Sequence, residues 1–403
     1  MRPFESRHIL LGVTGGIACY KSVTLARRLT QAGATVDVVL TRAAREFVGA
    51  ITFEAVTGRR VLHSLLGEGH ALDHIRLARA ANLVMVAPAT ADFLSRAAAA
   101  RANDLLTAIL LATEAPVLLA PAMNDNMWAH QLVQQNVSRL REAGYVVVEP
   151  DVGALAENDS DRPGRMPEPE ALLLQAARML EAKGELSGRH VLVTAGPTRE
   201  ALDPVRFLSN HSSGKMGVAI AEAAWRRGAR VTLIAGPLSV PIPPGPAHIA
   251  VESTREMHDA VANALPDADV LVMSAAPSDY RASREAESKM KREAGTPAIE
   301  LVPNPDILSD TAPLRRKGAI AVGFALETDN VLANARRKLD GKKLDLLVVN
   351  DAREPGAGFG VDTNVVTLLD GNGGEDALPR MPKSDVADAI LDRVEAIIRG
   401  RGL

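Results

Sequence analysis

The residues best suited to binding an anion lie at 209–217, which read Ser-Asn-His-Ser-Ser-Gly-Lys-Met-Gly. The run combines hydroxyl, amide and ammonium donors with two glycines, and an Ala-rich helical pattern follows it. Because the N-terminus of a helix presents unpaired backbone N–H groups, such a loop can wrap a phosphate or a carboxylate. The run contains neither Gly-x-x-x-x-Gly-Lys-Ser/Thr nor Gly-x-Gly-x-x-Gly, so it does not identify the ligand. A polar loop with a helix cap is the alternative.

In the first half of the chain, unusual residues also follow predicted strands. Gly15 and Gly16 would allow a phosphate to approach the backbone closely, although a plain tight turn would use the same residues. Residues 121–128 read Pro-Ala-Met-Asn-Asp-Asn-Met-Trp, a combination that packing alone does not explain. Residues past the carboxyl ends of parallel strands are placed where open α/β sheets bind ligands.

His74 is a candidate for proton transfer, although a lone histidine is more often structural. His70 and His74 have the spacing of two metal ligands on one helix face. Because no third ligand and no His-Glu-x-x-His pattern accompany them, we predict no metal site there.

Charged residues of the second half form a further group. Asp279 follows a predicted strand and could bind a base or a ribose, or could simply cap a helix. Lys338 and Lys342 are one helical turn apart, so both could face a triphosphate. The basic residues at 288–292 would, without further information, simply face solvent.

The elements that must position these residues alternate between short apolar runs and helical patterns. Strands are predicted at 8–15, 36–41, 83–88 and 117–121 in the first half, and near 190–195, 231–235, 270–276, 321–328 and 345–350 in the second. A helix is predicted at 17–33 and an amphipathic helix at 386–398. The alternation predicts an α/β protein with two Rossmann-like, doubly wound domains, an N-terminal one at 1–186 and a C-terminal one at 187–403.

The composition limits the classes of function. The 403 residues include 47% apolar and 24% charged residues, with a net charge of −3, which is ordinary for a globular protein of two domains. We therefore predict no nucleic-acid and no membrane partner, and we expect a cytoplasmic protein because no signal peptide or spanning segment is evident. The single cysteine, Cys19, excludes an intramolecular disulfide and a zinc site built from cysteines.

The second half resembles the phosphopantothenate cysteine ligases, on the strings Asp-Pro-Val-Arg at 203–206 and Ser-Asn-His-Ser-Ser-Gly-Lys-Met-Gly at 209–217. The resemblance implies a nucleotide-binding ligase domain with a catalytic lysine at Lys289, where Met290 and Arg292 depart mildly from the family pattern, and Asn210 holding an acyl-cytidylate. It also implies Mg²⁺ on the phosphates, with metal ligands that the sequence does not assign. Implied for CTP are Met273, Ser274, Ala275, Asp279, Lys289, Asn304, Pro305, Asp306, Ile307, Phe324, Lys338 and Lys342.

The first half resembles the flavin-containing cysteine decarboxylases, whose signature Pro-x-Met-Asn-x-x-Met-Trp is matched at 121–128. The resemblance implies a flavodoxin-like domain that binds FMN, with His74 catalytic and Asn124 holding the substrate carboxylate. In that family the flavin oxidises the cysteinyl CH₂–SH so that CO₂ can leave. Implied for FMN are Gly15, Gly16, Thr41, Ala89, Thr90 and Met123.

One departure from the decarboxylases concerns the mobile clamp, which in the family carries a cysteine acid before Gly-Arg-Met. Gly-Arg-Met stands at 164–166, but the segment before it is longer than expected and lacks the cysteine; Glu157 or Asn158 takes its place, depending on the alignment. Glu157 could be the proton donor, because partial burial raises a carboxyl pKa. Alternatively, the reaction stops at the oxidised enethiol, or this half is impaired. Cys19 lies on the first helix and is expected to be buried.

As a whole, the chain resembles the bifunctional coenzyme A biosynthesis enzymes. The resemblance implies ligation of 4'-phosphopantothenate to L-cysteine with CTP, followed by FMN-dependent decarboxylation to 4'-phosphopantetheine. It also implies a homo-oligomer built from trimers of the first half and dimers of the second, which together would make a dodecamer. A ligase with a non-catalytic flavin half, and a regulatory flavin-binding protein, are the alternatives.

Overall fold

The computed structural model describes residues 2–66, 71–154, 161–290, 298–327, 331–351 and 360–402. The chain divides into two compact units, Met1–Glu181 and Ala182–Leu403, which we call the N-terminal and C-terminal units. The division falls a few residues before the predicted boundary at 186. Its physical reason is Leu186, which is fully buried in the core of the C-terminal unit.

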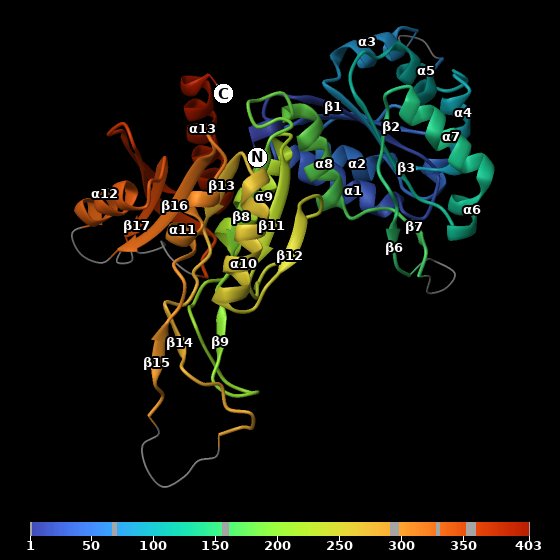
Figure 1. Cartoon of the computed structure of the whole chain (residues 1–403). Helices are drawn as coiled ribbons and strands as arrows, with labels where there is room; N and C mark the ends of the chain where they lie inside the picture. The colour runs from blue at the N-terminus through green and yellow to red at the C-terminus, as the bar shows by residue number, and fades with distance from the viewer. Residues whose placement is uncertain are drawn as a thin grey trace. The chain divides into compact units, whose positions relative to one another are not determined.

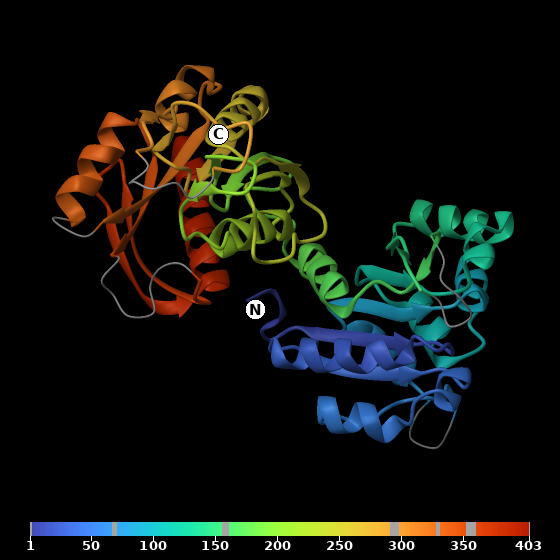
Figure 2. The same cartoon turned by 90° about the horizontal axis from the view of Figure 1, so that it is seen from below.

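The N-terminal unit is a parallel sheet with helices on both faces (Figures 1 and 2). Its strands, in the order β2-β1-β3-β4-β5, are β1 (His8–Val13), β2 (Thr35–Leu40), β3 (Leu83–Ala89), β4 (Val117–Pro121) and β5 (Val146–Val147). These strands read as near-continuous apolar runs because helices cover both of their faces. The order is that of flavodoxin-like folds, so the predicted fold class is confirmed for this half.

The helices of this unit form one layer on each face of the sheet. One layer has α1 (Cys19–Gln31), α2 (Ala50–Thr57) and α8 (Pro169–Glu181); the other has α3 (Asp73–Ala80), α4 (Ala91–Ala98), α5 (Leu105–Ala112) and α7 (Gln131–Glu142). Short elements complete the unit: η1 (Arg2–Phe4), η2 (Ala43–Glu46), α6 (Asp125–Ala129) and an antiparallel hairpin of β6 (Asp151–Val152) and β7 (Pro163–Arg165).

The C-terminal unit is built on an eight-stranded sheet in the order β12-β11-β8-β13-β16-β17-β18-β19. The strands are β8 (His190–Ala195), β11 (Arg230–Ala235), β12 (Ala247–Ala250), β13 (Val270–Met273), β16 (Ile320–Glu327), β17 (Leu346–Asp351), β18 (Thr363–Asp370) and β19 (Glu375–Pro382). The first six in this order are parallel and follow the doubly wound pattern, which confirms the predicted class. The antiparallel pair β18 and β19 is an addition that we did not predict.

A tight turn explains this addition. Asp370 at the end of β18 accepts hydrogen bonds from the backbone N–H groups of Asn372 and Gly374, each at 2.9 Å. Such a turn returns the chain beside itself, whereas a parallel neighbour would need a longer crossover.

Helices α9 (Lys215–Arg226) and α13 (Lys383–Arg401) cover one face of this sheet, and α10 (Thr254–Ala264), α11 (Ile307–Asp310) and α12 (Val331–Gly341) cover the other. Two single-turn helices, η3 (Leu265–Asp267) and η4 (Ala312–Leu314), connect them to strands.

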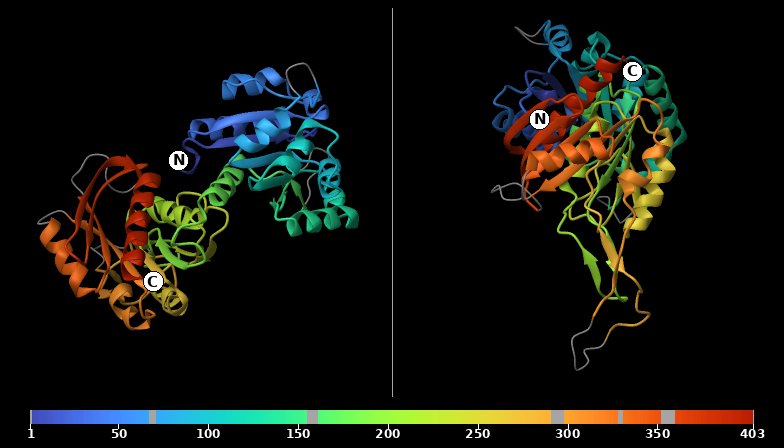
Figure 3. Two further views of the ribbon diagram at one scale, coloured as in Figure 1. Left: turned by 90° about the horizontal axis from the view of Figure 1, so that it is seen from above. Right: turned by 60° about the vertical axis from the view of Figure 1, so that its left-hand side comes forward.

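An arm projects away from the sheet of the C-terminal unit (Figures 1 and 3). It consists of two antiparallel pairs, β9 (Arg199–Ala201) with β10 (Phe207–Ser209), and β14 (Tyr280–Ala282) with β15 (Leu301–Pro303). Among the helices that the structure describes, none is long and apolar enough to cross a bilayer.

Candidate active sites

A cavity of about 1180 Å³ lies at the carboxyl ends of the strands in the N-terminal unit. It is lined by Thr14, Gly15 and Gly16, which follow β1, and by Thr90, which follows β3. The strand order changes direction between β1 and β3, and ligands of open α/β sheets bind at such a point. The segments that the sequence analysis singled out after these two strands therefore line one cavity.

The wall formed by Thr14 to Gly16 fits a phosphate. A Cβ on Gly15 would lie 2.8 Å from the carbonyl carbon of Ala43, so only glycine allows this approach. The hydroxyl of Thr14 donates to the carbonyl of Pro88 at 2.7 Å and accepts from the N–H of Thr90 at 3.1 Å. These bonds tie the two strand ends together beside the N-terminal end of α1, where the helix dipole favours an anion.

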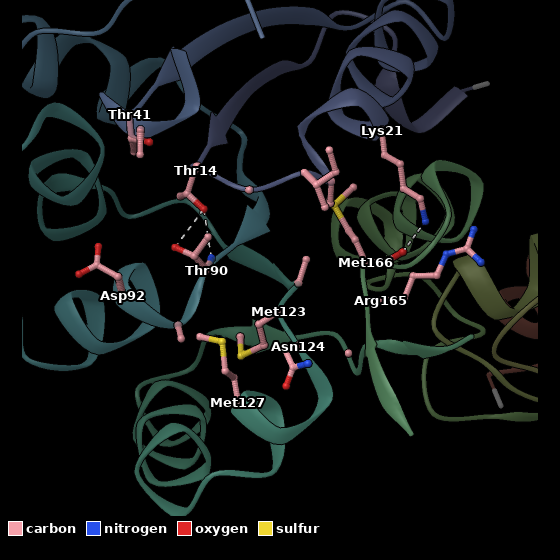
Figure 4. A pocket seen from close by; sticks show the side chains of 18 of the residues that line it. Thr14, Lys21, Thr41, Thr90, Asp92, Met123, Asn124, Met127, Arg165 and Met166 are labelled. Carbon is pink, nitrogen blue, oxygen red and sulfur yellow. Dashed lines mark hydrogen bonds between the residues drawn. The ribbon is translucent and has the colours of Figure 1, made fainter. Parts of the chain in front are cut away.

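The opposite wall carries residues 123–127, which we call the Asn124 segment (Figure 4). Asn124 caps α6, with its Oδ1 accepting from the N–H of Asn126 at 2.9 Å. This bond fixes the side-chain amide so that its NH₂ end serves as a donor, which suits a carboxylate. Met123 and Met127 also line the cavity and offer it soft apolar surface, which suits a flat ring system. The glycines, hydroxyls and methionines together fit a flavin mononucleotide.

The hairpin of β6 and β7 closes one side of the same cavity. Ala154, Gly164, Arg165 and Met166 are among the lining residues. The N–H of Met123 donates to the carbonyl of Gly164 at 3.0 Å, so the hairpin is bonded to the Asn124 segment. The resemblance to the decarboxylases predicts the clamp in this part of the sequence. The predicted proton donor Glu157 falls within 155–160 and lies outside the described residues.

Predicted and observed residues overlap strongly in this cavity. Lining it are the predicted Gly15, Gly16, Thr41, Thr90, Met123 and Asn124. Among the described residues, the lining does not include Ala89, whose side chain is fully buried in β3. Its carbonyl accepts from the N–H of Ala122 at 3.3 Å, so it supports a lining residue instead. Sequence reasoning missed Lys21, a cation on the buried face of α1 that contacts the hairpin.

His74 is not among the described residues that line this cavity. It belongs to α3, which packs against α5, whereas Asn124 precedes α6 on a different side of the unit (Figure 1). Its Nδ1 is buried and has no hydrogen-bond partner among the described residues. Of the two residues that the resemblance implies for decarboxylation, Asn124 lines this cavity and His74 is not among its described lining residues.

Cys19 is fully buried, as expected, and its thiol donates to the carbonyl of Thr14 at 3.1 Å. Burial raises the pKa of this thiol above its usual value. Cys19 thus stabilises the turn that begins at Thr14, and it does not lie on the hairpin of β6 and β7.

A second cavity, of about 530 Å³, lies at the carboxyl ends of the strands in the C-terminal unit. The segments that follow β8 and β13 flank it, and the strand order changes direction between these two strands. Gly217 allows α9 to approach the sheet, because a Cβ there would lie 2.6 Å from the hydroxyl oxygen of Ser274. The predicted residues that line the cavity are Asn210, Met273, Ser274, Ala275, Asp279, Asn304, Pro305, Asp306, Ile307, Phe324, Lys338 and Lys342.

Cations are prominent in this cavity. Lys338 donates to the carbonyl of Phe324 at 2.9 Å, and Lys342 is paired with Asp306 at 2.9 Å. Burial favours the neutral form of Asp306, but hydrogen bonds from Lys342 and Ser309 outweigh it and lower the pKa of this carboxyl. Lys338 lies in the last turn of α12 and Lys342 directly follows this helix, and both line the cavity.

Two further lysines line the cavity, and sequence reasoning missed them. Lys215 forms an ion pair with Asp362 at 2.6 Å, and its hydrogen bond lowers the pKa of that carboxyl. Lys383 donates to the carbonyl of Val361 at 2.6 Å; burial, and then the charge of Lys215, lower its pKa. Lys215 lay within the donor-rich run at 209–217, so its type was a usable signal. The position of Lys383 in the sequence was not a usable signal, because only the assembled sheet brings this residue to the cavity.

Asn210 and Asn304 are oriented by backbone carbonyls beside the cavity. The Nδ2 group of Asn210 donates to the carbonyls of Ala276 and Pro277, both at 3.1 Å. The Nδ2 group of Asn304 donates to the carbonyl of Ser278 at 2.9 Å. The loop after β13 therefore holds both amides at the mouth of one crevice.

Lys289 is exposed and is not among the described residues that line this cavity. It lies near the arm, next to Met290, whose N–H donates to Asp203 at 3.1 Å. No group of three or more His, Cys, Asp or Glu side chains suited to a metal occurs among the described residues.

Comparison with known proteins agrees with the division of the chain into an N-terminal and a C-terminal unit. The family model "Flavoprotein" matches residues 2–180, and the model "DNA/pantothenate metabolism flavoprotein C-terminal domain" matches residues 186–398. The chain is 44% identical to a coenzyme A biosynthesis bifunctional protein of Vibrio vulnificus, over 99% of this chain and all of that protein. It is 43% identical to the protein of the same description in Bacillus subtilis, over 99% of each chain.

Among solved structures, a PPC decarboxylase mutant complexed with pantothenoylaminoethenethiol is 28% identical. It covers 43% of this chain and 98% of its own, with a TM-score of 0.39.

Proposed function

The chain belongs to the family of bifunctional coenzyme A biosynthesis proteins, with a ligase and a decarboxylase activity, and from this premise we propose how its two cavities divide the chemistry. The C-terminal cavity joins 4'-phosphopantothenate to cysteine with CTP. The N-terminal cavity, with FMN, decarboxylates the product to 4'-phosphopantetheine. The observation that carries this proposal is the presence of two separate cavities with different linings, each at the point where its own strand order reverses.

The lining of the C-terminal cavity supports a nucleotide triphosphate. Lys338, Lys342 and Lys215 stabilise charge on the phosphates, including the departing pyrophosphate. Attack of the substrate carboxylate on CTP forms a mixed anhydride, the acyl-cytidylate, and releases pyrophosphate; the amine of cysteine then displaces CMP. Asn210 holds the acyl-cytidylate, and Mg²⁺ accompanies the phosphates.

Lys289 must approach this crevice for its proposed catalytic role. It is exposed and is not among the described residues that line this cavity, so in this proposal it acts after a movement of the arm or from a second copy of the chain. Either way, the arm contributes to a complete ligase site.

The lining of the N-terminal cavity supports a flavin and a cysteinyl substrate. FMN, when bound, would supply a reversible two-electron oxidation, in which the electrons removed before CO₂ leaves are returned afterwards, so that the overall decarboxylation is redox-neutral. Asn124 holds the substrate carboxylate, Gly15, Gly16 and Thr90 hold the phosphate end of the cofactor, and Glu157 returns a proton. We propose that His74 acts as a base on the site of a neighbouring copy, because α3 carries it away from Asn124 within one chain.

This arrangement requires a homo-oligomer, and trimers of the N-terminal unit with dimers of the C-terminal unit are part of the proposal. A cytoplasmic location is also proposed, since all proposed substrates are small polar metabolites. The regulatory flavin-binding alternative is not favoured, because the full-length relatives are described as bifunctional biosynthesis proteins.

Product analysis of the purified full chain tests the proposal. Incubation with 4'-phosphopantothenate, cysteine, CTP and Mg²⁺ should give 4'-phosphopantetheine, CMP and pyrophosphate by mass spectrometry. Asn124→Ala should accumulate the cysteine conjugate, and Lys338→Met should form little of it. If the unaltered chain accumulates only the conjugate, the decarboxylase half of the proposal is wrong; if it forms no conjugate, the ligase half is wrong.

A further inference from the structure

Lys21 is a buried cation on α1 that contacts the segment after the hairpin of β6 and β7. Its side chain is 5% exposed, and its ammonium donates to the carbonyl of Met166 at 2.7 Å and to the carboxylate of Glu168 at 3.0 Å. Met166 directly follows β7 (Figure 4), and Glu168 comes two residues later. A single side chain thus joins α1, the helix after the Gly15–Gly16 turn, to residues 166–168, which follow the hairpin.

The position of Lys21 is unfavourable for stability alone. It lies in the first turn of α1, where the helix dipole disfavours a positive charge, and burial of an ammonium removes its hydration. A buried ion pair replaced by apolar residues of similar volume is often no less stable. The hydrogen bonds of Lys21 are therefore better explained if they position the segment that follows β7.

The hairpin is attached to the cavity on its other side as well. A Cβ on Gly164 would lie 2.6 Å from the carbonyl oxygen of Met123, so β7 lies directly against the Asn124 segment. Arg162 donates to the side chain of Asn126 at 2.9 Å. The base of the hairpin is thus bonded to the Asn124 segment on one side and to α1 on the other.

We propose that Lys21 is a positioning residue for decarboxylation: it fixes residues 163–168, and with them the part of the cavity wall that Gly164 and Met166 form beside Asn124. Glu168 assists by accepting from both Lys21 and Arg165, the latter at 2.6 Å. The proposal rests on the decarboxylase function of the N-terminal cavity and adds a residue to it. Lys21 touches neither the reacting atoms nor, in its proposed role, the flavin.

Steady-state decarboxylation of the purified cysteine conjugate by the full chain tests this role. Lys21→Met should bind flavin as the unaltered chain does but raise KM for the conjugate, or lower kcat/KM, by about 10-fold to 100-fold, as a misplaced substrate-holding element does. Lys21→Arg, which keeps a cation and several donors, should recover much of the loss. Ligase activity of the same samples should not change, which reports on the folding of the rest of the chain.

Two other variants keep the test decisive. Glu168→Gln changes a half-exposed side chain, so it should fold, and it should show a smaller loss in the same parameter. Arg28→Met is the matched control, because Arg28 also joins α1 to the segment after the hairpin, through an exposed ion pair with Glu170 at 2.6 Å. Exposed pairs contribute little, so this variant should have unaltered kinetics.

The outcomes separate this proposal from the proposed function. If the unaltered chain does not decarboxylate the conjugate, the proposed function itself is wrong. If it does, and Lys21→Met and Glu168→Gln both retain its KM and kcat, Lys21 does not position residues 163–168 for decarboxylation. Loss of flavin from Lys21→Met, seen in the absorbance spectrum, would overturn the proposal in favour of a cofactor-holding role.

Discussion

Gly15 and Ala43 are in such close contact that a Cβ on Gly15 would lie 2.8 Å from the carbonyl carbon of Ala43. The next residue, Gly16, is different: a Cβ there would meet only the Cγ2 of Thr90, at 3.8 Å. Neighbouring glycines of one turn therefore have unequal tolerance for a side chain. The difference provides a matched pair for testing the flavin cavity.

Gly15→Ala should weaken flavin binding more than Gly16→Ala does, because only the side chain at position 15 would clash with the backbone. Overpacking of this kind costs about 1–3 kcal/mol, which corresponds to about 5-fold to 150-fold in affinity if the turn must shift to admit it. Titration of flavin-free protein with FMN, followed by absorbance and fluorescence, measures the difference. Equal affinity of the two variants would show that this turn does not contact the cofactor.

Lys338→Met should raise KM for CTP in formation of the cysteine conjugate. A hydrogen bond to a charged group contributes about 1.5–3 kcal/mol, so we expect an increase of about 10-fold to 100-fold. Arg336 is the control on the same helix, because it is half-exposed and paired with Glu375 at 3.2 Å. Comparable changes in Lys338→Met and Arg336→Met would point to a general effect of charge rather than to phosphate binding.

The C-terminal unit should lose stability as the pH falls below neutrality, through His190. Its Nδ1 lies 3.1 Å from the carbonyl oxygen of Asp267 and its Nε2 lies 2.9 Å from the hydroxyl of Thr232. Burial is the largest influence on this group and lowers its pKa below the ordinary value. The folded state therefore favours neutral His190, and below about pH 6.5 the unfolded state binds a proton that the folded state does not.

The stabilising effect of His190 is thus complete above the unfolded pKa and is lost as the pH falls through the lower, folded pKa. Amide hydrogen exchange of β8 peptides between pH 5 and 8, corrected for the intrinsic rate, should show it. His190→Gln should flatten the dependence, and the same change at the exposed His248 should leave it unaltered. A dependence that survives in His190→Gln would assign it to other groups.

Glu157→Gln should stop the reaction after CO₂ has left and before the final proton transfer. If Glu157 is the donor, the oxidised enethiol product should accumulate, two hydrogen atoms lighter than 4'-phosphopantetheine, while ligation continues. Glu157→Cys should then restore the reduced product, because a thiol can also donate a proton. Asn158→Ala is the control for the other alignment of this segment. An unchanged product from Glu157→Gln would assign the proton to a different group.

The sequence by itself determined the two doubly wound sheets and most of both cavity linings. Apolar runs such as that of β1 are local, and the parallel arrangement brings residues that follow neighbouring strands, such as Thr90 and Gly15, to one edge. Residues that directly follow a strand could therefore be placed without a structure. The motif at 121–128 was recognisable for the same reason.

Only the tertiary structure decided where residues on helices and on the arm lie. His74 and Lys289 have the types expected for their roles, but the packing of α3 on α5 and the projection of the arm place them off the cavities of one chain. Lys21 became visible because a hydrogen bond across 145 residues joins it to Met166. Strand ends follow from a repeating local pattern, whereas such contacts depend on how separate elements pack, and no local pattern encodes that.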